Sequence, residues 1–207
     1  MPLPAGPGDR YAGYAVLDVR FASGDILALR RFPVASIGIG YTSVWHRGAD
    51  GEWTLFADVP RTVGCARYFG DLFAHAVVAP IRIDWRGPRS LVVEVQGGQI
   101  LKWRLDLTSS AATTVFNAAA GCLPTASKFV NLALTLGGLR LTDHVPDGMR
   151  LRALPEAVWA VNASRARLRC RDLGCLRSDV GIPGRRIELW RPRRSLFAAG
   201  ALVIDGP

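Results

Sequence analysis

Strict alternation of apolar and charged residues is the feature that most restricts what this chain can fold into. From Leu101 to Leu107 the odd positions are Leu or Trp and the even positions are Lys, Arg or Asp. Because successive side chains of a β-strand point to opposite faces, this pattern predicts a strand with one face in the core and one in water. The same rule places Ile81, Ile83 and Trp85 inside a second strand.

Gly-containing turns separate several β-prone runs in the first half of the chain. The segments "ASGD", "RGADG", "RGPR" and "QGGQ" predict hairpin turns. The strands that these turns join are predicted at residues 14–21, 26–32, 37–46, 52–59, 79–85, 90–95 and 100–107.

The pattern changes after Ser109. "SSAATTVFNAAAGCLP" and "TASKFVNLALTLGG" (125–138) each resemble a short helix that has start and stop signals. Strands are expected to resume around the turns "PDG" and "NAS", and again near the C-terminus. Their predicted positions are residues 139–145, 149–154, 156–161, 165–171, 187–190 and 195–205.

These elements predict a mainly β fold, an antiparallel meander that closes into a lipocalin-like barrel of about eleven strands. A single domain spans residues 1–207, with a disordered segment at 1–10 and a helical insertion at 110–137. Closing the sheet removes its unpaired edges, and a barrel of more than about eight strands leaves room for a ligand.

Basic residues are concentrated late in the chain. The formal net charge is +9, and residues 165–194 hold ten arginines against three acids, so this segment carries 10 − 3 = +7. Arg165, Arg167, Arg169 and Arg171 would share one face of a strand. They form either a solvated face or a patch that binds anions, on an anionic membrane surface or a nucleic acid. Nucleic acid is the less favoured partner, because no aromatic residues are interleaved for base stacking.

Common signatures of nucleotide, zinc-protease and hydrolase chemistry are absent from the sequence. No metal site and no cofactor is predicted. The four cysteines lack zinc-finger spacing and are interpreted as buried thiols. With no export signal and no apolar run long enough for a bilayer, a cytoplasmic location is expected.

Three residues are candidates for acid–base chemistry. His46 ends the run "YTSVWH" beside a hairpin turn and is expected at the rim or in solvent. His75 lies in the apolar run "FAHAVVAP", where it is either a hydrogen-bonded core residue or an acid or base in an apolar cavity. Either histidine could carry the proton, and Tyr41 is expected to be a hydrogen-bond partner. Five further aromatic residues belong either to the barrel core or to a ligand lining: Trp45, Trp53, Tyr68, Trp85 and Trp103.

The run "SIGIGYTSVWHRGADGEWTLFADVP", with "CARYFG", "APIRIDWRGPRSLVVEV" and "LKWRLDL", carries a family resemblance. The chain resembles uncharacterised bacterial proteins of lipocalin-like β-barrel architecture. More loosely it is similar to the group of carotenoid hydratase (hydroxyneurosporene synthase) and tocopherol cyclase. This resemblance implies a barrel and an apolar, isoprenoid-like or lipid-like ligand. The Gly-x-Trp motif of lipocalins is missing, with Gly13-Tyr14 near its place.

Three functions remain open on the sequence. The first is binding, with or without acid–base conversion, of an apolar small molecule in a barrel cavity. The second is docking on an anionic surface through residues 165–194, and the third is a scaffold with a filled core.

Overall fold

The computed structural model describes residues 2–97, 100–122, 142–177 and 195–206. Within them it contains twelve strands and one α-helix, so the predicted mainly β class is confirmed. The predicted helix at 125–138 and strand at 187–190 lie outside the described residues. The strands are β1 (Asp9–Arg20), β2 (Ile26–Ala35), β3 (Tyr41–Arg47), β4 (Trp53–Ala57), β5 (Phe73–Val78), β6 (Ile81–Trp85), β7 (Ser90–Val95), β8 (Leu101–Thr108), β9 (Thr142–His144), β10 (Arg150–Leu168), β11 (Arg171–Cys175) and β12 (Leu196–Asp205).

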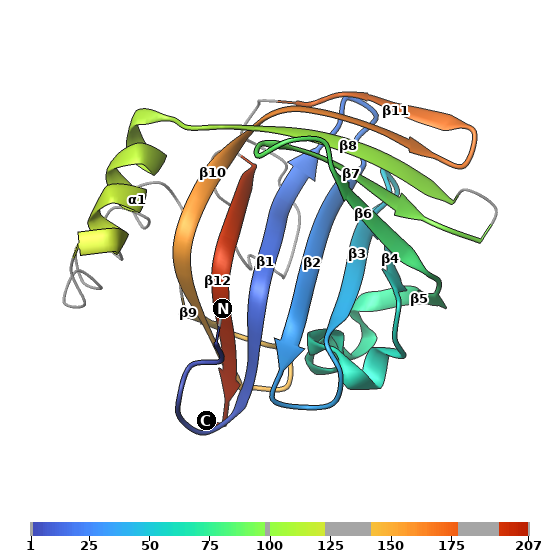
Figure 1. Cartoon of the computed structure of the whole chain (residues 1–207). Helices are drawn as coiled ribbons and strands as arrows, with labels where there is room; N and C mark the ends of the chain where they lie inside the picture. Colours follow the sequence, from blue (N-terminus) through green and yellow to red (C-terminus); the bar gives the residue numbers. More distant parts are fainter. Residues whose placement is uncertain (1, 98–99, 123–141, 178–194, 207) are drawn as a thin grey trace.

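The strands form one sheet made of two meanders. Its order is β5-β4-β3-β2-β1-β12-β10-β8-β7-β6, and β9 and β11 pair with β10. The last strand, β12, lies between β1 and β10 and so joins the two meanders (Figure 1). Most neighbours are antiparallel, but β4 and β5 are parallel because the chain passes through two 3₁₀ helices, η1 (Arg61–Val63) and η2 (Cys65–Leu72), between them.

The two edge strands meet at one corner without pairing along their length. Only Ala79 and Pro80 separate β5 from β6. The Ala79 N–H donates to the Ala57 carbonyl at 2.8 Å, and Pro80 accepts from the Gln96 N–H at 2.9 Å. Because proline has no N–H to continue a ladder, the chain bends here. The result agrees with the predicted barrel-like architecture, but within the described residues no hydrogen bonds between β5 and β6 close the sheet.

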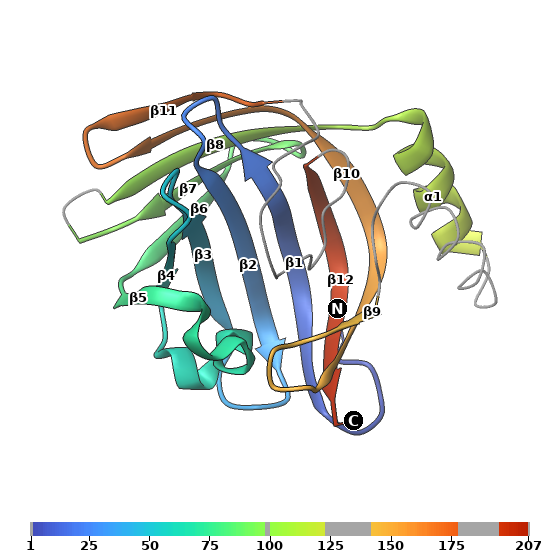
Figure 2. The ribbon, with the colours of Figure 1, turned by 180° about the vertical axis from the view of Figure 1, so that it is seen from behind.

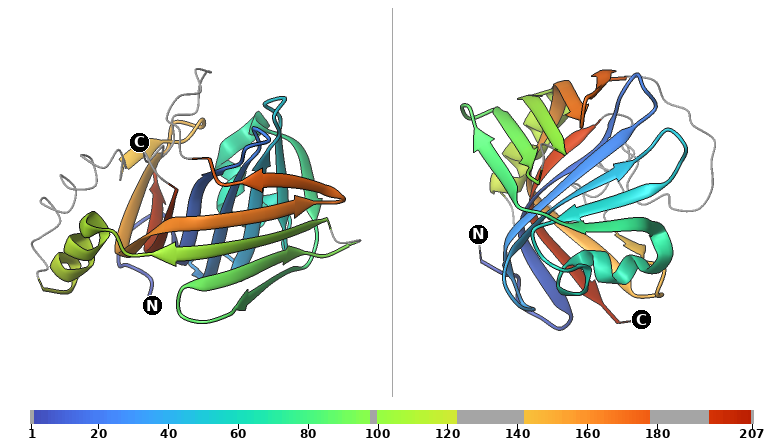
Figure 3. Two further views of the ribbon diagram at one scale, coloured as in Figure 1. Left: turned by 90° about the horizontal axis from the view of Figure 1, so that it is seen from above. Right: turned by 90° about the vertical axis from the view of Figure 1, so that its right-hand side faces the viewer.

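The main core lies between the two halves of this sheet. Strands β7, β8 and the second half of β10 run across β1–β4 (Figure 3). The alternation predicted for residues 101–107 is confirmed, since the odd positions of β8 are buried and Lys102 and Arg104 are exposed. A second core covers the other face of β2–β4, beneath η2 (Figure 2).

The predicted turn at "NAS" is wrong. Residues 150–168 form one strand of 19 residues, which pairs with β12 along its first half and with β8 along its second. Register shifts between Pro155 and Ala157 and between Val161 and Ala163 mark the places where it bends. Pairing with β12 as far as Ala160 and with β8 on both sides of Asn162 keeps the chain extended here, although the sequence around Asn162 is typical of a turn.

The first predicted helix is confirmed as α1 (Ala111–Cys122). At its start, Ser110 Oγ accepts from the Thr113 N–H at 3.2 Å, and Thr113 Oγ1 accepts from the Ser110 N–H at 2.7 Å. Asn117 ties the helix to β10 by hydrogen bonds to both backbone groups of Val158. No helix in the described part of the chain is both long and apolar enough to cross a bilayer.

Candidate functional site

A groove of about 900 Å³ opens at the side of the molecule between the β3–β5 region and the β10–β11 hairpin. Its volume is in the range of small-molecule sites, about 300–1,000 Å³. The described residues that line it are His46, Thr54, Phe56, Ala74, His75, Ala76, Val77, Ile100, Leu168, Arg169, Cys170 and Arg171. Phe56 also belongs to the main core, so the floor of the groove is continuous with the protein interior.

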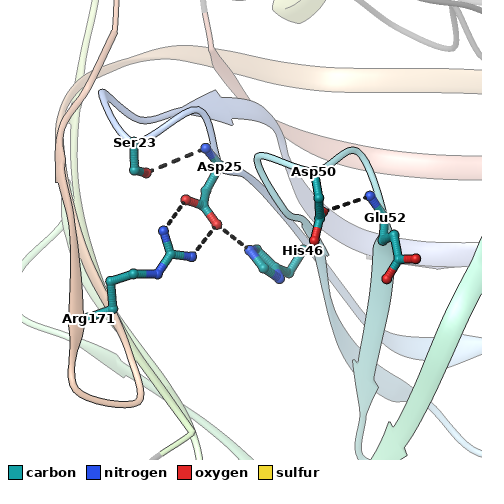
Figure 4. Close-up of polar contacts among 6 residues, drawn as sticks. All are labelled: Ser23, Asp25, His46, Asp50, Glu52 and Arg171. Atoms are coloured by element: carbon teal, nitrogen blue, oxygen red, sulfur yellow. Dashed lines mark hydrogen bonds and ion pairs between the residues drawn. The ribbon is translucent and has the colours of Figure 1, made fainter.

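A buried carboxylate organises one wall of this groove. Asp25 follows the β1–β2 turn, and its side chain is fully buried. Arg171 of β11 donates Nη1 to Oδ2 at 2.8 Å and Nη2 to Oδ1 at 2.7 Å. His46 of β3 donates Nε2 to Oδ1 at 2.7 Å from the other side (Figure 4). Three segments remote in sequence therefore meet at one carboxyl group.

The backbone fixes this meeting point. The β1–β2 turn is hydrogen-bonded to β11 through the Ala22 N–H to the Cys175 carbonyl at 3.0 Å and the Ser23 N–H to the Leu173 carbonyl at 3.2 Å. A bridge between Phe21 and Leu176 extends the contact. The β10–β11 hairpin is thus held over the end of the β1–β2 hairpin, and Arg171 reaches Asp25 from it.

Electrostatics keep Asp25 ionised. Burial alone would raise the pKa of this carboxyl group, but hydrogen bonds with Arg171, Ser23 and His46, together with the charge of Arg171, lower its pKa to about 2. The hydrogen bond to Asp25 in turn raises the pKa of Arg171. Asp25 therefore acts as an acceptor only, and the His46 Nε2 atom that faces it carries a proton.

His46 is buried, with 8% of its surface exposed, so the expected rim or solvated position is wrong. The covering strand β11 comes from a distant part of the chain, which explains the difference. No hydrogen bond joins Nδ1 to another described residue. In the neutral form of an imidazole whose Nε2–H is held by Asp25, Nδ1 carries the free lone pair.

His75 lies on β5 and is exposed, so the core interpretation is wrong for this residue. It lines the same groove as His46, and the structure brings these two candidates to one site. Tyr41 is elsewhere. It is buried in the second core, where its hydroxyl accepts from the Cys65 N–H at 3.0 Å, and burial raises its pKa well above the ordinary value.

None of the five aromatic candidates lines the groove. Trp45, Trp53 and Tyr68 pack in or against the second core. Trp103 is fully buried and donates Nε1 to Ser164 Oγ at 2.8 Å. Trp85 is 43% exposed and packs edge-on against Tyr14 and Phe197.

The four alternating arginines do not share one face. Arg165 and Arg167 are exposed on the outside of β10, opposite Arg104 and Lys102 of β8. The chain then turns at residues 169–170, so Arg169 and Arg171 line the groove instead. The predicted single strand at 165–171 is therefore wrong. Contact of the outer face with an anionic surface stays a prediction, and the basic residues at 178–194 lie outside the described residues.

Two of the cysteines are also placed differently from the prediction. Cys65 is buried, but Cys170 and Cys175 are exposed, and Cys170 lines the groove. The side chain of Cys122 is outside the described set. Among the described residues no cluster of three or more His, Cys, Asp or Glu side chains could hold a metal ion.

Sequence reasoning missed Asp25 and Cys170 as residues of this site. The pattern "ASGD" predicts only a turn, and Asp25 lies 146 positions before its partner Arg171. No local pattern marks such a pair. A buried polar residue beside a turn is recognisable only when the covering strand is known.

Comparisons with known proteins give weak structural similarity at low identity. No family model and no curated protein matches the chain. An acetoacetate decarboxylase structure from Legionella pneumophila is 12% identical, with a TM-score of 0.46, and covers 100% of this chain and 88% of that one. A second acetoacetate decarboxylase structure is 11% identical, with a TM-score of 0.48, and covers 99% and 88%. Similarity at this level does not transfer an activity, and the resemblance to carotenoid hydratases stays a prediction.

Proposed function

We propose that this protein binds a small molecule with an apolar, isoprenoid-like or lipid-like body in the groove between β3–β5 and the β10–β11 hairpin. The observation that carries the proposal is the groove itself, whose floor is a side chain of the main core. Phe56 lies at the bottom, and Ile100 and Leu168 are half-buried beside it. Burial of apolar ligand surface against such side chains contributes about 25 cal/mol per Å².

The groove combines this apolar floor with polar groups in its walls. His46, His75 and Thr54 come from three strands, and the hairpin adds Arg169 and Arg171. A mainly apolar site with a few polar groups is the usual composition of a small-molecule site, in which the polar groups fix the orientation of the ligand. The Asp25–Arg171 pair holds one wall of the groove in place.

The first test is organic extraction of the purified protein followed by mass spectrometry. An apolar compound should be recovered and should rebind to the stripped protein. Repeated failure to recover or bind any apolar compound would count against the proposal.

Alkylation of cysteines then locates the bound compound. Cys170 and Cys175 are both exposed and lie on the same hairpin, but only Cys170 lines the groove. Bound ligand should slow the reaction of Cys170 with iodoacetamide and leave Cys175 unchanged, as measured on peptides from a protease that does not cleave at arginine. Equal protection of both cysteines, or of neither, would place the compound elsewhere.

A second candidate function, acid–base conversion of the bound compound, is favoured by the Asp25–His46 contact. Because Asp25 holds the proton on Nε2, Nδ1 of His46 is available to accept a proton from a ligand. His75 supplies a second imidazole in the same groove. Exchange of ligand protons in D₂O, followed by mass spectrometry, tests this role. His46→Gln should lose the exchange and still bind the ligand, whereas undiminished exchange would remove His46 from the role.

A further inference from the structure

The groove is positively charged along its hairpin side. Its described lining contains two arginines and two histidines, and no carboxylate. Asp25 is the acidic residue that contacts the lining residues Arg171 and His46. Its side chain is fully buried, and its carboxylate is already hydrogen-bonded to both of them. A ligand in the groove therefore meets basic groups without a competing acidic side chain from the described lining.

The two arginines of the groove differ in what they can still bind. Arg171 uses both of its terminal nitrogens on Asp25. The guanidinium of Arg169 makes no hydrogen bond or ion pair with any described residue. Only Arg169 therefore has its planar set of donors available to a ligand.

The backbone of Arg169 is held in a conformation that disfavours its side chain. Leu168 and Arg171 are paired, so Arg169 and Cys170 form a two-residue hairpin turn, and φ of Arg169 is +54°. Glycine is the residue usually found at such a position, since a Cβ is unfavourable there. The Arg169 N–H donates to the Ile100 carbonyl at 2.7 Å, which fixes the turn against the segment preceding β8. Unfavourable backbone conformations of this kind are concentrated at ligand sites.

We propose that Arg169 binds an oxyanion of the ligand, a carboxylate or a phosphate, and so orients an amphipathic anion in the groove. This inference rests on the proposed function and names the class of its ligand. The acidic head lies at the hairpin tip, where the guanidinium can bind two oxygens at once. The apolar body extends over Phe56, Ile100 and Leu168.

Two fluorescent probes that differ by one group test this assignment. N-phenyl-1-naphthylamine is neutral, and 8-anilinonaphthalene-1-sulfonate is the same molecule with a sulfonate. Both should bind with protection of Cys170, and the sulfonate should bind about tenfold more tightly, because a charge-assisted hydrogen bond adds to the apolar contact.

Variants at position 169 distinguish the effect of the Arg169 charge on ligand binding from its effect on the stability of the fold. Arg169→Ala and Arg169→Gly should both abolish the preference for the sulfonate, with unchanged binding of the neutral probe. Arg169→Gly should also raise the urea midpoint of unfolding above that of Arg169→Ala, because glycine tolerates the positive φ. Arg169→Lys should retain part of the preference. Arg82→Ala removes an exposed arginine of β6 that is paired with Asp84 outside the groove, and it should change neither probe.

Each outcome decides between the two proposals. Equal binding of both probes to the wild type, or an unchanged preference in Arg169→Ala, overturns the role of Arg169 and leaves the apolar groove standing. If neither probe binds, or if the probes bind without protecting Cys170, the proposed function itself is overturned. Displacement of the sulfonate by dodecanoate or by dodecyl phosphate then identifies which head group is preferred, and displacement by neither overturns the assignment.

Discussion

Asp25 and Arg171 form a bidentate ion pair although 146 positions separate them in the chain. Arg171 Nη1 donates to Asp25 Oδ2 at 2.8 Å, and Nη2 donates to Oδ1 at 2.7 Å. The carboxyl group is fully buried, whereas the arginine side chain is 51% exposed and reaches the groove. The pair thus connects the β1–β2 turn, β11 and, through His46, the wall of the proposed ligand site.

Replacement of the carboxylate by an amide tests how much this pair stabilises the fold. Asp25→Asn leaves Arg171 without its anionic partner and weakens the contact with His46. The free energy of unfolding, measured by urea titration, should fall by about 2–3 kcal/mol, since hydrogen bonds to charged groups contribute about 1.5–3 kcal/mol.

Asp50→Asn is the matched control for this substitution. Asp50 is an exposed aspartate of the next hairpin, and its Oδ1 accepts from the Glu52 N–H at 3.0 Å (Figure 4). The substitution should cost less than about 1 kcal/mol. Equal losses in the two variants would show that the buried ion pair contributes no more than an ordinary turn hydrogen bond.

Acid should weaken the fold through the same group. The pKa of Asp25 is about 2 in the folded protein, below its ordinary value of 3.8. A depressed carboxyl pKa contributes stability that is fully present above about pH 4 and is lost as the pH falls toward about 2. Urea titrations across this window should show a smaller decrease for Asp25→Asn than for the wild type. Parallel decreases would assign the acid sensitivity to other carboxylates.

Tyr41→Phe should affect stability and leave ligand binding unchanged. Its hydroxyl is buried in the second core and accepts from the Cys65 N–H, which would lose this partner. We expect a loss of about 1 kcal/mol in the free energy of unfolding, with unchanged affinity for the neutral probe. A large loss of affinity without loss of stability would instead restore Tyr41 as a residue of the site.

Gly13→Ala should strongly destabilise the sheet. Gly13 has φ of +158° and faces Gly200 across β1 and β12, and a Cβ at this position would lie 2.0 Å from the Arg31 carbonyl oxygen. We expect a loss of about 1–3 kcal/mol or more, because the contact is with backbone atoms that cannot move aside. Gly206→Ala, which meets nothing within 4 Å, is the control and should leave the urea midpoint unchanged.

Much of the fold could be predicted from local pattern. The period-two alternation of residues 101–107 and the turn at "RGPR" correctly predicted β8 and the β6–β7 hairpin, because burial on one face of a strand repeats every two residues. The start signals of "SSAATTVFNAAAGCLP" likewise predicted α1. The "NAS" turn failed because pairing of β10 with β12 and β8 overrides the local preference of Asn162.

The sequence identified several residues of the candidate site but not their placement. His46 and His75 were recognised as titratable residues, but their exposures were predicted in the wrong direction. Arg169 and Arg171 were assigned to one strand face, and the two-residue turn between Leu168 and Arg171 was missed. A single misplaced turn moves side chains from the outer surface into the groove, because a hairpin reverses the direction of the chain.

The sequence by itself determined the strands with clear alternation, above all β8 and the β6–β7 hairpin, and which side chains of β8 face the core, because a repeat of two residues is a local property of a pleated chain. The tertiary structure decided that β12 joins the two meanders, that Ala79 and Pro80 bring the sheet edges to one corner, and that β11 covers Asp25 and His46. These contacts join residues far apart in the chain, and their free energy depends on burial and charge partners that no local pattern contains.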